Sequence, residues 1–234
     1  MIIACDRRPV CHPWHRAFSS TDDAMNSAPP TVFIVDDDAS VLKALERLIA
    51  GAGLKVATFD SPQRFLDCHD PSTPGCLVLD VEMPGLNGVE LQRALADRGS
   101  ILPIIFLTGH GDVPKGVQAM KRGAVDFLTK PADEKDLLAA IGQAFDRDRV
   151  LRQERGGLAE IHGRLATLTA REREVLAYIV SGRRNKQIAA DLGTVEKTIK
   201  VHRARVMEKL KVRSLADLVR LAERAGVERP PYGS

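Results

Sequence analysis

Hydrophobic and polar positions divide the chain into two parts with different patterns. In the first part, four short apolar runs alternate with longer segments that carry apolar residues at helical spacing. The runs are Thr31–Val35 and residues 76–79, 104–107 and 125–128. Runs this short and this apolar are typical of strands buried on both faces of a parallel sheet. The longer segments predict helices, among them 39–51, 86–98, 113–122 and 133–149.

A parallel sheet whose strands are joined by helices has few topologies open to it. Strands and helices alternate five times within residues 31–145. Right-handed crossovers between them predict an α/β, flavodoxin-like, doubly wound (βα)5 fold with the strand order 2-1-3-4-5. In such a sheet the residues just past the carboxyl ends of the strands line the ligand crevice.

The second part of the chain has the helical pattern alone. Thr169 followed by Glu172 is a capping box and predicts the start of a helix. Three more segments with apolar stripes follow it: 185–192, 195–210 and 214–225. Gly193-Thr194 makes a tight turn between the first two of these. This arrangement predicts an all-α, four-helix domain with a helix-turn-helix, whose second helix enters the DNA major groove.

Candidate chemistry lies at the carboxyl ends of the apolar runs. Asp36 and Asp37 follow the first run, Asp80 the second, Thr108 the third and Lys130 the fourth. One crevice therefore collects three carboxylates, a hydroxyl and an ammonium group. Three clustered carboxylates repel one another unless a hard divalent cation lies among them, and Mg²⁺ prefers such oxygen ligands. A carboxylate held against this metal beside a hydroxyl and a lysine is equipped to accept a phosphoryl group.

These residues stand in motifs that resemble the receiver domain of bacterial two-component response regulators. The matching segments occur in the family's order: residues 35–38, 79–88, 107–112 and 126–131. The resemblance implies that a sensor histidine kinase phosphorylates Asp80. It also implies that Asp37, Asp80 and the backbone carbonyl of Glu82 bind Mg²⁺, with Asp36 assisting through water. Lys130 is expected to pair with the phosphoryl oxygens, and the Lys130-Pro131 bond is expected to be cis.

The same resemblance implies a switch. Thr108 would offer its hydroxyl to the phosphoryl group, and Phe127 stands where receivers place a rotating aromatic side chain. Plain core packing is the alternative for Phe127, because a phenylalanine has no polar group to anchor it. The surface formed by 113–122, the fifth strand and 133–149 is then expected to form a homodimer.

The second part resembles the LuxR/NarL-type helix-turn-helix and, within that group, its FixJ-like branch. The matching segments are 168–176, 185–189, 198–202, 201–207 and 214–220, and residues 108–114 of the first part point to the same branch. The resemblance implies that Lys200, Val201 and Arg203 face the DNA bases and that Lys186 and Lys197 contact phosphates. Helix 214–225 is expected as a dimer contact, with simple packing as the alternative.

Length and charge agree with two domains that have different partners. The 234 residues suffice for two modest domains. Residues 31–145 contain 11 Lys/Arg and 16 Asp/Glu, whereas residues 167–228 contain 14 and 8. The basic half therefore suits a polyanion such as DNA. No apolar run approaches the roughly 20 residues that cross a bilayer, so we expect no membrane association and a cytoplasmic location.

The predicted domains leave two segments over. Residues 1–30 lack hydrophobic periodicity and are expected to be a disordered extension, with Met1 and Met25 both open as translation starts. The receiver is assigned to 31–149 and the DNA-binding domain to 167–228, with 150–166 as the linker. Gly156-Gly157 is predicted to break the helix that enters this linker and to act as a hinge.

Three functions remain open at this stage. The first, which we favour, is a phosphorylation-switched transcription regulator that binds promoter DNA as a dimer, with RNA polymerase as a partner and activation as its effect. It would be no enzyme beyond Mg²⁺-dependent self-phosphotransfer and slow autodephosphorylation. The second is a phosphatase with an aspartyl-phosphate intermediate, in which Glu82 would be the acid–base group. The third is a receiver that acts as a phosphate sink or a protein-interaction module without binding DNA.

Overall fold

The strands form one parallel sheet. The computed structural model describes residues 29–109 and 120–227, and within them the sheet has the order β2-β1-β3-β4-β5. The strands are β1 (Thr31–Val35), β2 (Lys55–Phe59), β3 (Gly75–Asp80), β4 (Ile104–Thr108) and β5 (Asp126–Thr129). The predicted strand order is confirmed. The predicted extension 1–30 (except its last two residues) and most of the predicted helix 113–122 lie outside the described residues.

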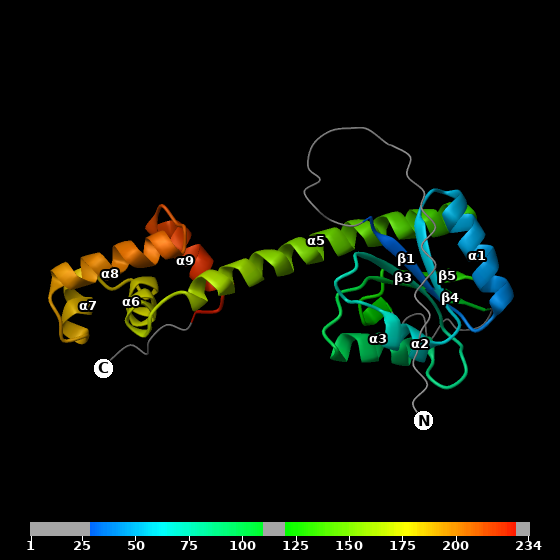
Figure 1. Ribbon diagram of the computed structural model, residues 1–234, viewed down its shortest axis with the longest axis horizontal. Coiled ribbons are helices and arrows are strands. Elements are labelled where there is room, and N and C mark those ends of the chain that lie inside the picture. Colours follow the sequence, from blue (N-terminus) through cyan, green and yellow to red (C-terminus); the bar gives the residue numbers. More distant parts are fainter. Residues whose placement is uncertain (1–28, 110–119, 228–234) are drawn as a thin grey trace, which may run out of the picture.

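Helices cover both faces of the sheet. They are α1 (Ala39–Gly51), α2 (Pro62–Cys68), α3 (Gly88–Asp97) and the long α5 (Glu134–Ala166). Figure 1 shows these helices around the sheet. One apolar cluster packs between the sheet and α2 and α3, and a second packs between the sheet and α1 and α5. The central strands β1, β3 and β4 are buried along their whole length, as the apolar runs predicted. The carboxyl ends of these strands are therefore held in fixed positions.

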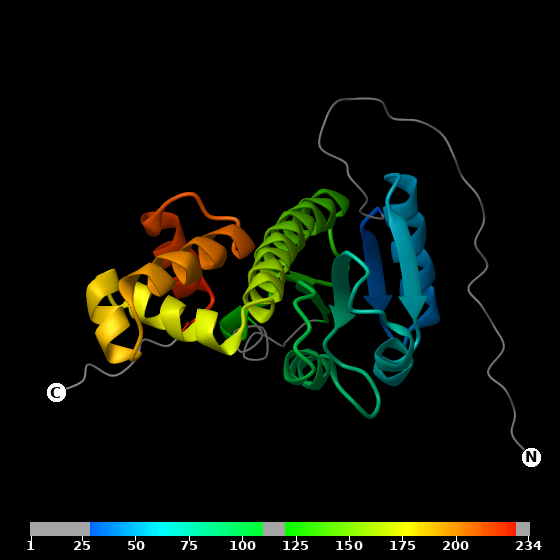
Figure 2. The same ribbon diagram turned by 60° about the vertical axis from the view of Figure 1, so that its left-hand side comes forward.

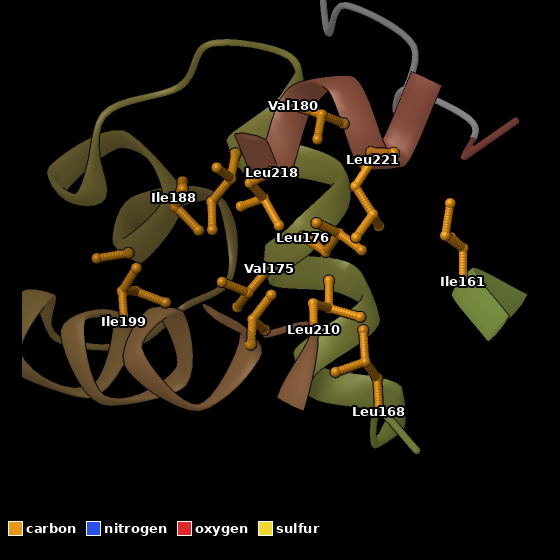
Figure 3. Close-up of a cluster of buried hydrophobic side chains, with 14 residues drawn as sticks. Ile161, Leu168, Val175, Leu176, Val180, Ile188, Ile199, Leu210, Leu218 and Leu221 are labelled. Atoms are coloured by element: carbon orange, nitrogen blue, oxygen red, sulfur yellow. The ribbon is translucent and has the colours of Figure 1, made fainter. Parts of the chain in front are cut away.

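The second domain consists, among the described residues, of α6 (Ala170–Val180), α7 (Asn185–Asp191), α8 (Glu196–Lys209) and α9 (Leu215–Arg224). The capping box of Thr169 and Glu172 is formed at the start of α6 as predicted. The buried faces of the helices meet in one apolar cluster, to which α6 contributes most centrally (Figure 3). Figure 3 shows Val175, Leu176 and Ile188 pointing into this cluster. The all-α prediction is confirmed.

The interdomain helix contradicts one prediction. Gly156-Gly157 was predicted to break it, but α5 runs without interruption through both glycines into the second domain (Figures 1 and 2). Two glycines destabilise a helix by about 2 kcal/mol relative to alanine. Contacts on either side offset this, because Arg155 donates to the carbonyl of Gly99 and Ile161 is buried against the second domain. The break prediction was wrong because local propensity was outweighed by tertiary contacts.

The length of α5 does not make it a membrane segment. It has 33 residues, but charged side chains recur along it. In the part of the chain that the structure describes, no helix combines the length and the apolar character that a bilayer crossing requires.

Candidate functional site

The carboxyl edge of the sheet gathers the predicted acidic residues. Asp36 and Asp37 directly follow β1, and Asp80 is the last residue of β3. Oxygen atoms of these three carboxylates lie within 4.8 Å of one another. Asp36 and Asp80 are buried, whereas Asp37 is exposed. Two inner carboxylates and one at the surface make a small acidic crevice that opens to solvent.

Lys130 closes this crevice from the end of β5. Its Nζ lies 2.6 Å from Asp36 Oδ2 and 2.8 Å from Asp80 Oδ1. Burial alone would lower the pKa of Lys130, but the bonds to the two carboxylates outweigh it and raise the pKa above its ordinary value. The ammonium group therefore stays charged and neutralises part of the acidic crevice.

The negative charge of Asp80 is only partly compensated by its surroundings. Burial raises the pKa of its carboxyl group, and the neighbouring charges of Asp36 and Asp37 raise it further against the lowering effect of Lys130. A backbone contact fixes its place as well, since an added Cβ at Gly88 would overlap the carbonyl oxygen of Asp80. The start of α3 thus packs tightly against the end of β3.

Thr108 and Phe127 lie beside the crevice on β4 and β5. Thr108 ends β4, is buried, and donates its hydroxyl to the carbonyl of Gly109 at 3.2 Å. The amide of Lys130 donates to the carbonyl of Thr108 at 2.6 Å, and the Lys130-Pro131 bond is cis as expected. Phe127 is half-buried, with its ring centroid 6.5 Å from that of Phe106. In this structure Phe127 makes the contacts of a side chain packed in the core.

The crevice fits a hard divalent cation. Its three carboxylates converge at one place, two of them are buried, and one lysine leaves the group with a net negative charge. Oxygen ligands of this kind suit Mg²⁺. Glu82 stands two residues after Asp80, and its side chain is exposed. The structure therefore shows an acidic cluster able to hold a metal.

The second domain presents basic side chains along α7 and α8. Lys186 on α7 and Lys197 on α8 are exposed, and Val201 is 45% exposed. Lys200 pairs at 3.2 Å with Glu196, but both side chains are open to solvent, so this pair is weak and easily exchanged. The opposite side of α8 is buried through Ile199 and Val206.

Two side-chain contacts were missed by sequence reasoning. Asn185 accepts a hydrogen bond from Arg203 at 3.4 Å and ties that side chain to α7. Asp148 belongs to a run of charged residues, yet it is only 2% exposed and is paired with Arg152. The spacing of four residues between Asp148 and Arg152 was a signal for this pair, but spacing alone does not show that a charge is buried.

Each half of the chain matches a known protein family. Residues 32–142 match the response regulator receiver domain, and residues 166–222 match the bacterial regulatory proteins of the luxR family. The two matches fall on the sheet domain and the helical domain respectively. A chain with these two domains has a sensor kinase and DNA as its implied partners, and it is not an enzyme of the ordinary kind.

Similar proteins share this arrangement over nearly their whole length. Nodulation protein W of Bradyrhizobium diazoefficiens is 44% identical over 86% of this chain and 88% of its own. The transcriptional regulatory protein FixJ of Azorhizobium caulinodans is 44% identical over 84% of this chain and 93% of its own. The solved structure of the response regulator StyR matches with a TM-score of 0.75 and 48% identity, over 84% of this chain and all of that one.

The folded domains, their order and these full-length similarities agree with one another. This chain belongs to the FixJ-like branch of the LuxR family of two-component response regulators, which regulate transcription.

Proposed function

We propose that Asp80 accepts the phosphoryl group that controls this regulator. The observation that carries the proposal is the buried Asp80 carboxylate at the carboxyl edge of β3, 2.8 Å from the ammonium group of Lys130 and beside Asp36 and Asp37. An oxygen of Asp80 would attack the phosphorus of a kinase phosphohistidine while the phosphorus–nitrogen bond breaks, and the electron pair stays on the imidazole. Self-phosphotransfer from a small phosphodonor and slow autodephosphorylation belong to the same proposal.

The other side chains of the crevice have separate roles in this step. Lys130 would neutralise phosphoryl oxygens, and its hydrogen bond to Asp36 holds its ammonium group beside the attacking carboxylate of Asp80. Asp36, Asp37, Asp80 and the carbonyl of Glu82 would hold Mg²⁺. The bound ion supplies charge stabilisation to the transferring group.

Phosphoryl transfer can be tested on the full chain with acetyl phosphate and Mg²⁺. Wild-type protein should take up label, and Asp80→Asn should take up none. Asp60→Asn is a matched control, because Asp60 is an exposed carboxylate whose partner Arg64 also lies at the surface. Full labelling of the Asp80→Asn protein would refute the assignment.

We infer that Thr108 and Phe127 transmit phosphorylation. The Thr108 hydroxyl, which now donates to the carbonyl of Gly109, would turn to the phosphoryl oxygens, and Phe127 would follow into the space that it leaves. The surface of β5 and α5, together with residues 113–122, would then form a homodimer. Beryllofluoride should produce dimers at micromolar concentration in analytical ultracentrifugation, and a protein that stays monomeric would contradict this route.

In the second domain we propose that two sets of residues bind DNA in different ways. Lys200, Val201 and Arg203 on α8 would reach base edges, whereas Lys186 and Lys197 would contact phosphates. Loss of a base contact should weaken specific binding by roughly 1–3 kcal/mol and leave non-specific binding unchanged. Loss of a phosphate contact should weaken both and flatten the salt dependence.

The comparison of Lys200→Ala with Lys197→Ala tests that division. Both side chains are exposed on the same helix, so each variant controls for the other. Binding to specific and non-specific DNA is measured across a salt series. Equal loss on both DNAs for Lys200→Ala would refute its role in base recognition.

The remaining proposals follow from the family. A regulator of this kind acts in the cytoplasm on double-stranded promoter DNA, contacts RNA polymerase and activates transcription, and α9 is a second dimer contact. We assign residues 31–149 to the receiver, 150–166 to the linker and 167–228 to the DNA-binding domain. Promoter–reporter assays with and without the phosphodonor test activation directly, and repression of the reporter would reverse that part of the proposal.

A further inference from the structure

A buried ion pair lies at the point where α5 leaves the sheet. Asp148 is 2% exposed, and its carboxylate accepts from the backbone amide of Gly75 at 3.0 Å. Arg152, one turn further along α5, donates through Nε to both oxygens of Asp148 at 2.8 and 2.9 Å. Gly75 is the first residue of β3, the strand that ends in Asp80. The pair therefore joins the helix directly to the central part of the sheet.

The same guanidinium group also holds the loop before β3. Its two remaining nitrogens donate to three successive backbone carbonyls, those of Pro71, Ser72 and Thr73, at 3.3, 2.9 and 2.7 Å. The planar fork of arginine suits such a set of fixed acceptors, and lysine does not reproduce it. Arg152 thus bonds at once to α5 and to the loop 71–73.

The loop has little freedom to yield. Gly75 has a φ of +155°, and a Cβ there would overlap the backbone of Thr31 on β1. The amide of Thr31 also donates to the carbonyl of Pro74 at 2.9 Å, so β1 holds the end of the loop while Arg152 holds residues 71–73. Removing the guanidinium would leave the Asp148 carboxylate buried with a single backbone donor, an unfavourable state.

Further along α5, its contacts pass from the sheet domain to the second domain. Arg155 donates to the carbonyl of Gly99 at 3.0 Å, and within the described residues α5 forms no hydrogen bond to the sheet domain beyond it. Ile161 is buried in the second domain, and Arg164 donates to the carbonyl of Leu210. Gly156 and Gly157 stand between the two sets of contacts. A Cβ on Gly156 would meet nothing within 4 Å, and one on Gly157 would make an ordinary contact, so packing does not require either glycine.

We propose that Arg152 is a positioning residue that, with Asp148, makes residues 150–155 a rigid extension of the receiver and fixes the direction in which the DNA-binding domain leaves it. The bending of α5 is then confined to Gly156-Gly157, because these residues weaken the helix between its hydrogen bond to Gly99 of the sheet domain and the burial of Ile161 in the second domain. The inference goes beyond the proposed function, since it does not depend on which residue is phosphorylated.

We call the Asp148–Arg152 pair, with its bonds to Gly75 and to the loop 71–73, the clamp. Hydrogen exchange of the full chain tests whether it holds residues 150–155. In Arg152→Ala, the amides of 150–155 should exchange at least about tenfold faster, while those of 137–144 should keep their protection. Arg149→Ala is the matched control, because Arg149 and its partner Asp146 are both mostly exposed on the same helix. It should leave exchange in 150–155 unchanged. Wild-type protection of 150–155 in Arg152→Ala would overturn the proposal.

A second variant keeps the test decisive if Arg152→Ala does not fold. Arg152→Lys retains a positive charge beside Asp148 but cannot bond to the three loop carbonyls, so it should also speed exchange of 150–155. X-ray scattering of the same protein should show a broader distribution of interdomain distances than the wild type. The double variant Gly156→Ala/Gly157→Ala should narrow that distribution. Unchanged scattering in both variants would show that neither the clamp nor the glycines set the domain geometry.

Discussion

Replacing Asp80 with asparagine is expected to stabilise the receiver when no divalent cation is present. Oxygens of Asp36, Asp37 and Asp80 lie within 4.8 Å of one another. At an effective dielectric constant of about 20, two unit charges at this distance repel by about 3.5 kcal/mol, so Asp80 meets about 7 kcal/mol of repulsion. Lys130, at 2.8 Å, attracts it by about 6 kcal/mol on the same scale. The remaining repulsion of about 1 kcal/mol adds to the unfavourable burial of the charge.

The expected gain for Asp80→Asn is therefore about 1–2 kcal/mol, which corresponds to a rise in Tm of about 3–6 °C. Its dependence on pH has a definite sign. The pKa of Asp80 is raised in the folded state, so the folded protein takes up this proton more readily than the unfolded chain. The penalty is present above the folded pKa and disappears as the pH falls through it toward the unfolded value of 3.8. The difference between variant and wild type should shrink over that window.

Thermal unfolding of the full chain in EDTA and in Mg²⁺ measures both effects. A metal at ten times its Kd stabilises the folded state by about 1.4 kcal/mol, and the variant should lose much of this gain. Asp60→Asn controls for the change of charge at an exposed site. If Asp80→Asn unfolds at a lower temperature than the wild type in EDTA near neutral pH, the assignment of Asp80 as an undercompensated buried charge is wrong.

Four other substitutions can be followed by urea unfolding. Glu172→Gln should destabilise the second domain by about 1.5–3 kcal/mol, because it weakens the charge-assisted hydrogen bond between the buried Glu172 and the half-buried Lys209. That bond and the cap hold the pKa of Glu172 at about 2, so its stabilisation is present above pH 4.5 and is lost as the pH falls toward 2. Lys211→Gly should stabilise by up to about 1 kcal/mol, because this lysine has a φ of +54°. Gly88→Ala should destabilise by more than about 2 kcal/mol, because its Cβ would overlap the backbone of β3, whereas Gly142→Ala, in open space on α5, should stabilise. An unchanged midpoint in any of the first three variants would contradict the corresponding contact.

The strands and helices were largely predictable because burial and backbone conformation leave a direct trace in the sequence. The central strands read as apolar runs since both their faces are covered. β2 was the exception, and no run identified it in advance. It is an edge strand in which every position is exposed or half-buried, so its pairing with β1 rather than its composition makes it a strand.

The candidate site was predictable for a topological reason. Parallel strands end at one edge of the sheet, so residues that follow separate apolar runs must come together, and Asp36, Asp80 and Lys130 do. The order of these residues in the sequence did not show which of their charged groups bond to one another. The bonds of Lys130 to both buried carboxylates follow from distances that only the folded sheet provides.

The sequence by itself determined the two domain folds, the strand order and the residues gathered at the sheet edge, because hydrophobic period and chain topology suffice for these. Tertiary structure decided the state of the segment between the domains. Gly156-Gly157 carries a local preference against helix, and the charged run that contains Asp148 reads as solvent-exposed. Contacts with residues distant in sequence reverse both, since Gly75 and the loop before β3 bury Asp148 with Arg152, and the two domains hold α5 on either side of the glycines. Local propensities amount to about 1 kcal/mol per residue, and several tertiary hydrogen bonds outweigh them.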